Sequence, residues 1–146
     1  MTTEMQLAYV LRLLVAAVLG ALVGIEREAR GRDAGMRTFG AVALGACAFT
    51  ILSVAAVPPD HDTARIAAQI VTGVGFLGAG VILRGHGHIS GLTTSATLWA
   101  TAAVGMAVGY GLFLLAVATA ALLLALLLLR QVPWLPGRAN DKPPGE

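Results

Sequence analysis

Hydrophobic residues gather along this chain into five runs that are separated by short polar stretches. The runs have 17 to 20 residues each. As α-helix such a run is about 26–30 Å long, close to the hydrocarbon thickness of a bilayer. The pattern predicts an all-α integral membrane bundle of five transmembrane helices. The expected spans are residues 7–25, 38–57, 66–83, 92–108 and 112–129.

Two features set the limits of the predicted domain. The last two runs would form one helix too long for a bilayer, so Gly109-Tyr110-Gly111 predicts a break between them. A signal peptide is not expected at the start, because its first segment should be basic. The residues before Arg12 include the acidic Glu4 and no basic residue. Residues 1–132 are expected to form the transmembrane domain, and residues 133–146, with four prolines, a disordered tail.

Composition strengthens the membrane prediction. Hydrophobic residues make up 57% of the chain and charged residues only 12%, against about 25% charged in soluble domains. A soluble globule could not bury so much apolar surface. Soluble enzymes, nucleic-acid-binding proteins and disordered proteins are therefore excluded, and the expected partner is the lipid bilayer.

The basic residues predict an orientation. Eight of the ten Lys and Arg residues fall on one side of the predicted spans, and only Arg12 and Arg65 fall on the other. The positive-inside rule then places the N-terminus outside and the C-terminus in the cytoplasm.

Glycines recur inside the predicted helices, where they allow close helix contacts in a bilayer. In the first run Gly20 and Gly24 are spaced for such a contact, and Arg27 continues the same face. The third run has small residues on two opposite faces, which predicts a central position for that helix. Its packing residues are Gly73 and Gly80, beside Gln69 on one face, and Gly75 and Gly78 on the other.

Polar residues suggest an interaction site in the fourth run and at the start of the second. Thr93, Thr97 and Thr101 are spaced four apart. Their hydroxyls are expected either to bond the carbonyls of their own helix or to line a small polar cavity. Trp99 lies deep in the span, so its indole N–H is expected to find a partner inside the bundle. Thr94 and Thr38 complete this polar set.

The densest charge cluster follows the first span and includes Glu26, Arg27, Glu28 and Arg37. It is either a solvated loop that fixes topology or a buried Glu–Arg network. In the network interpretation Arg37 pairs with Glu26 or Glu28, and Arg30 in the middle of the loop contributes little.

Catalytic signatures are missing from the sequence, which predicts that the protein is not an enzyme and has no cofactor. Mg²⁺ binding stays open. Short loop segments carry His86 and His88, and Asp60, His61 and Asp62, but they do not define metal ligands.

Taken together, the motifs resemble those of the MgtC/SapB membrane proteins. They are Gly24-Ile-Glu-Arg-Glu28, Gly35-Met-Arg-Thr38, Arg65-Ile-Ala-Ala-Gln69, Thr72-Gly-Val-Gly-Phe-Leu-Gly-Ala-Gly80 and Gly91-Leu-Thr-Thr94, with Trp99. The resemblance covers roughly residues 12 to 129 and implies a bacterial inner-membrane protein of five helices. In that family the proteins are associated with growth under magnesium limitation, and the best-known members regulate other membrane proteins, including ATP synthase.

Two departures from the family pattern narrow this expectation. Phe39 stands where many members have a histidine, which weakens any proton-sensing role. The chain also ends soon after the fifth span, so regulation through the ACT-like domain of the virulence-type members is not expected.

The resulting functional expectation is a protein of magnesium homeostasis or stress adaptation that contacts other membrane proteins or itself as a homo-oligomer. The alternative is a small Mg²⁺ or H⁺ transporter or channel subunit. In that alternative Gln69, the threonines and the Glu26 to Arg37 cluster line a path.

Overall fold

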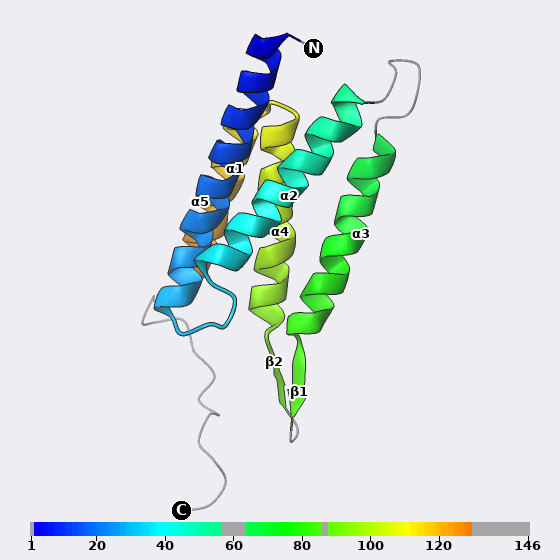
Figure 1. The fold of residues 1–146 in the computed structure, drawn as a ribbon. Coiled ribbons are helices and arrows are strands. Elements are labelled where there is room, and N and C mark those ends of the chain that lie inside the picture. Colours follow the sequence, from blue (N-terminus) through cyan, green and yellow to red (C-terminus); the bar gives the residue numbers. More distant parts are fainter. Residues whose placement is uncertain (1, 57–63, 86–87, 130–146) are drawn as a thin grey trace, which may run out of the picture.

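The computed structural model describes residues 2–56, 64–85 and 88–129. Over these residues the chain forms five α-helices that lie side by side along one common direction (Figure 1). The expected all-α fold class is confirmed. The helices are α1 (Thr3–Ala29), α2 (Met36–Ala55), α3 (Ala64–Val81), α4 (Leu92–Gly109) and α5 (Phe113–Leu129).

The helix lengths fit a membrane protein. By length and composition, α1, α2 and α4 are each able to cross a bilayer, and α3 and α5 are shorter apolar helices. α1 extends beyond the expected span 7–25 at both ends, and at its start the Thr2 side chain accepts a hydrogen bond from the Met5 amide and caps the helix. The expected break between α4 and α5 is present, and Gly111 adopts the positive φ of 80° that turns the chain there.

The helix at the centre of the bundle is α4, and the prediction that the third helix is central was wrong. α4 packs against each of the other four helices, whereas α3 packs mainly on α4 and α2. Figure 1 shows α3 at the edge of the bundle. Small residues on two faces of a helix permit close contacts on both, but they do not require them, and lipid covers an open face equally well.

Close helix contacts occur where glycine replaces a side chain. A β-carbon on Gly20 of α1 would lie 2.6 Å from the Phe39 carbonyl oxygen of α2, and one on Gly24 would lie 2.6 Å from the Met36 Cα. On α4, a β-carbon on Gly105 would collide with the Ala43 carbonyl of α2. Phe39 is fully buried in the core formed around these contacts. α1, α2 and α4 therefore form the tightly packed part of the bundle.

A short antiparallel hairpin joins α3 to α4, where the sequence predicts only a loop. Its strands are β1 (Leu83–Gly85) and β2 (His88–Ser90), with Leu83 opposite Ser90. Gly91 follows with φ 85° and forms the N-cap of α4. The hairpin thus sets the point at which α4 begins.

Candidate functional site

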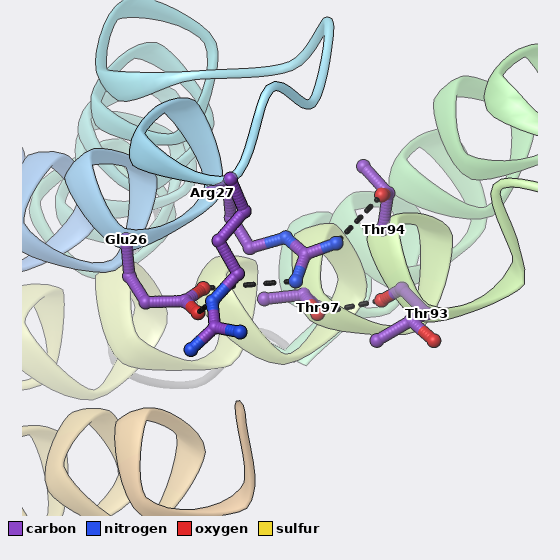
Figure 2. Close-up of polar contacts among 6 residues, drawn as sticks. Glu26, Arg27, Thr93, Thr94 and Thr97 are labelled. Carbon is purple, nitrogen blue, oxygen red and sulfur yellow. Dashed lines mark hydrogen bonds and ion pairs between the residues drawn. The ribbon is translucent and has the colours of Figure 1, made fainter. Parts of the chain in front are cut away.

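One end of the bundle, called here the Arg27 end, is where α1 ends and α2 and α4 begin. Arg27 lies in the last turn of α1, on the face that carries Gly20, and only 5% of it is exposed. Its Nη2 donates a hydrogen bond to Thr94 Oγ1 of α4 over 3.1 Å (Figure 2). Arg27 therefore links the end of α1 to the first turn of the central helix.

Glu26 is the counter-ion of this guanidinium. One of its carboxylate oxygens lies 3.6 Å from Arg27 Nη1 (Figure 2). The other pairs with Arg30 Nε, one turn further along the chain. The Glu26 side chain is 11% exposed and that of Arg30 31%. Of the two interpretations of the charge cluster, this geometry favours the buried network, in which one carboxylate serves two guanidiniums.

The hydrogen bonding of the network is incomplete. Among the described residues, the two buried carboxylate oxygens of Glu26 make these ion pairs but no hydrogen bond, and the buried Nε of Arg27 has no hydrogen-bond partner. Buried polar atoms usually have a hydrogen-bond partner. Buried polar atoms without one therefore need an explanation, either in the structure or in ligand binding. Arg32 adds further positive charge that acts on Arg27.

The expected pairing of Arg37 with a carboxylate is not present. Arg37 is exposed at the start of α2 and makes no ion pair within the described part of the chain. Glu28 instead accepts a hydrogen bond from the Met36 amide over 3.0 Å. α2 begins at Met36, so its first free N–H group takes the Glu28 carboxylate, and Arg30 rather than Arg37 reaches Glu26.

The opposite end of α4, the Arg12 end, also receives an arginine from α1. Arg12 Nη1 donates to the Gly109 carbonyl oxygen over 2.9 Å, and its guanidinium carbon lies 5.8 Å from the centre of the Tyr9 ring. From the sequence, Arg12 contributed only to the predicted orientation, and this backbone partner was not predicted. The sequence spacing is the signal for two parallel contacts between α1 and α4. Arg12 and Arg27 are fifteen residues apart, and Gly109 and Thr94 are also fifteen residues apart.

The threonines of α4 follow the first of the two interpretations. Thr97 Oγ1 donates to the Thr93 carbonyl over 2.6 Å, and Thr101 Oγ1 donates to the Thr97 carbonyl over 2.8 Å. These hydroxyls are satisfied within their own helix. Trp99 was expected to point into the bundle, but it is 53% exposed because its face of α4 is turned outward.

A groove of about 710 Å³ runs between α2 and α3. Gln69 and Thr38, both exposed, lie on its lining together with small and apolar side chains. A β-carbon on Gly45 of α2 or on Gly73 of α3 would meet no atom within 4 Å. At these two glycines the groove therefore has space for a neighbour from outside this chain.

The glycines of α3 correct the packing prediction for this helix. Gly75 and Gly80 also face open space, like Gly73. Only Gly78 packs within the chain, where a β-carbon would lie 2.5 Å from Ser95 Oγ of α4. These three open positions follow from the place of α3 at the edge of the bundle.

Metal ligands are not assigned. Among the side chains that the structure describes, no three from His, Cys, Asp or Glu gather to hold a metal ion. Asp60, His61, Asp62 and His86 lie outside the described residues, so the question of Mg²⁺ binding by these residues stays open.

Comparison with known proteins identifies the family. The model of the MgtC family matches residues 13–133. The chain belongs to the MgtC family. It is 52% identical to Protein MgtC of Salmonella typhimurium over 124 residues, which are 84% of this chain and 53% of that protein. It is 45% identical over 112 residues to YhiD of Escherichia coli K12, named provisionally as a magnesium transporter, with 72% of this chain and 52% of YhiD covered.

A third relative, the protein slr0014 of Synechocystis, is 54% identical over 105 residues, 70% of this chain and 44% of that protein. The chain thus spans about half the length of the curated relatives it matches. No solved structure matches it. The family and the apolar helices together make this a multi-pass membrane protein.

Proposed function

We propose that this protein serves magnesium homeostasis or stress adaptation by binding and regulating another membrane protein, or a second copy of itself, without catalysing a reaction. The family match and the name of the YhiD relative support the link to magnesium. The positive-inside pattern supports an inner-membrane protein whose C-terminus is cytoplasmic.

The observation that carries the regulatory role is the open groove between α2 and α3. In a bilayer, apolar side chains gain little by meeting each other instead of lipid, so helix association depends on close packing at small residues. Gly45 and Gly73 offer such a surface, and no atom of the described residues packs against it. Gln69 beside them offers both hydrogen-bond donors and an acceptor. The groove therefore suits a transmembrane helix of a partner.

The transport alternative requires the polar residues to share one path, and within one chain they do not. Gln69 lies in the outer groove, and Glu26 lies at the Arg27 end. The hydroxyls of Thr97 and Thr101 bond their own helix. Between these places the bundle is filled by fully buried apolar side chains, among them Phe39, Leu98 and Val104.

The first experiment measures ion flux in liposomes that contain only the purified protein, with a Mg²⁺ indicator or a pH dye inside. We expect the flux to equal that of empty liposomes. Flux above that level, lost on Gln69→Ala substitution, would contradict the regulatory proposal and support the transporter.

The second experiment tests the groove in cells under magnesium limitation. Gly73→Leu fills the groove, and Gly75→Leu adds the same side chain on the opposite face of α3, where space is also open. We expect both variants to accumulate normally, and only Gly73→Leu to lose function and co-purifying membrane proteins. Equal behaviour of the two variants would exclude the groove as the binding surface.

A further inference from the structure

The Arg27 end carries more positive than negative charge. Glu26 is the one carboxylate paired there in the described part of the chain, and it is shared by Arg27 and Arg30. The nearby carboxylate of Glu28 is engaged by the Met36 amide of α2. Over residues 26–37, four arginines stand against three carboxylates, which leaves one net positive charge at this end; the residues are Arg27, Arg30, Arg32 and Arg37, and Glu26, Glu28 and Asp33.

The start of α4 adds positive potential at the same place. The N-cap is Gly91, which has no side chain to accept the first N–H groups, and the first backbone bond of the helix is donated by Ser95. An α-helix start with free N–H groups carries about half a positive charge and favours anions. Arg27 lies in the last turn of α1, where the helix C-terminus favours a cation, but its Nη2 reaches Thr94 in the first turn of α4, where an anion is favoured instead.

Burial strengthens the effect of this excess positive charge. Arg27 is 5% exposed, its guanidinium extends to the first turn of α4, and its Nε has no hydrogen-bond partner among the described residues. Arg30 is the accessible member, because its side chain is 31% exposed, and it pairs with Glu26 through Nε. Its terminal nitrogens keep the fork geometry that binds phosphate.

The location determines which anion is at hand. The end of α1 and the start of α4 are the ends of helices that cross the bilayer, which is the depth of phospholipid headgroups. Basic groups between helices at this depth are suited to anionic headgroups. We propose that the Arg27 end binds the phosphate group of an anionic phospholipid, with Arg30 in contact and Arg27 and the start of α4 behind it. This site is separate from the groove and goes beyond the proposed function.

The test is thermal unfolding of the purified protein in a neutral detergent with added lipid. Short-chain phosphatidylglycerol should raise the Tm by about 4 °C or more. Phosphatidylcholine of the same chain length should give less than a third of that rise. Arg30→Gln should keep the fold and lose most of the phosphatidylglycerol effect.

Arg37→Gln is the matched control, because Arg37 is an exposed arginine at the same end that does not pair with Glu26. It should retain the full rise. An equal rise with both lipids, or an undiminished rise in Arg30→Gln, would overturn the site. A full rise with inorganic phosphate alone would overturn the assignment to lipid and leave a site for free phosphate.

Discussion

The two ends of α4 are held by the same kind of side chain from the same helix, yet the two contacts differ. Arg12 and Arg27 of α1 are about 22 Å apart along the helix, which matches the separation of Gly109 and Thr94 on α4. At the Arg12 end the guanidinium meets a carbonyl at the negative end of the helix dipole. At the Arg27 end it meets the positive end and has Glu26 beside it.

The difference shows why only one end resembles a functional site. A cation at a helix C-terminus is stabilised by the backbone itself, so Arg12 needs no carboxylate. Arg27 also lies at a helix C-terminus, that of α1, but its buried guanidinium reaches the N-terminal turn of α4, and the carboxylate paired with it, Glu26, is shared with Arg30. The Arg12 end is thus a structural contact, whereas the guanidiniums at the Arg27 end can still bind an anion.

The largest expected effect is at the Arg27 end. Arg27→Met should lower the free energy of unfolding by about 3 kcal/mol, because it removes the charge-assisted hydrogen bond to Thr94 and one of the two partners of the buried Glu26 carboxylate. Chemical unfolding in detergent micelles measures this. Arg37→Met, at an exposed and unpaired arginine, should change it by no more than about 0.5 kcal/mol. Similar losses for both variants would show that the cluster is only a topology signal.

Substitution at the Arg12 end should lower the free energy of unfolding less. Arg12→Met removes one charge-assisted hydrogen bond to the Gly109 carbonyl and should cost about 2 kcal/mol, without leaving a buried charge behind. The same unfolding assay applies. A loss larger than that of Arg27→Met would reverse the comparison between the two ends.

The smallest effects separate the threonines of α4. Thr94→Val removes the acceptor of Arg27 and should cost about 1.5 kcal/mol, because the donor is charged. Thr97→Val removes a hydroxyl that bonds its own helix and should cost less than about 0.5 kcal/mol. Equal losses of unfolding free energy in the two variants would mean that the Arg27–Thr94 contact contributes nothing to stability.

Much of the fold could be predicted from the sequence, because apolar runs of membrane length leave few alternatives to helices. The break at Gly111 and the position of Arg27 on the Gly20 face follow from local geometry. The place of α3 could not be predicted. Helical spacing shows which residues share a face, whereas the neighbour that covers this face is a tertiary property.

The candidate site was predicted only in part for a similar reason. The cluster of charges is visible in the sequence, but its pairing depends on the path between α1 and α2. Because α2 begins at Met36, its free amide takes Glu28, and this leaves Arg37 on the surface. Trp99 shows the same limit, since its depth in α4 is readable from sequence and its direction is not.

The most direct test of the contact between α1 and α4 is a double-mutant cycle with Arg27→Met and Thr94→Val. The structure joins these side chains across the two helices at 3.1 Å. We therefore expect a coupling energy of about 1 kcal/mol or more in chemical unfolding. Effects that add to within about 0.5 kcal/mol would contradict the contact, and with it the buried network at the Arg27 end.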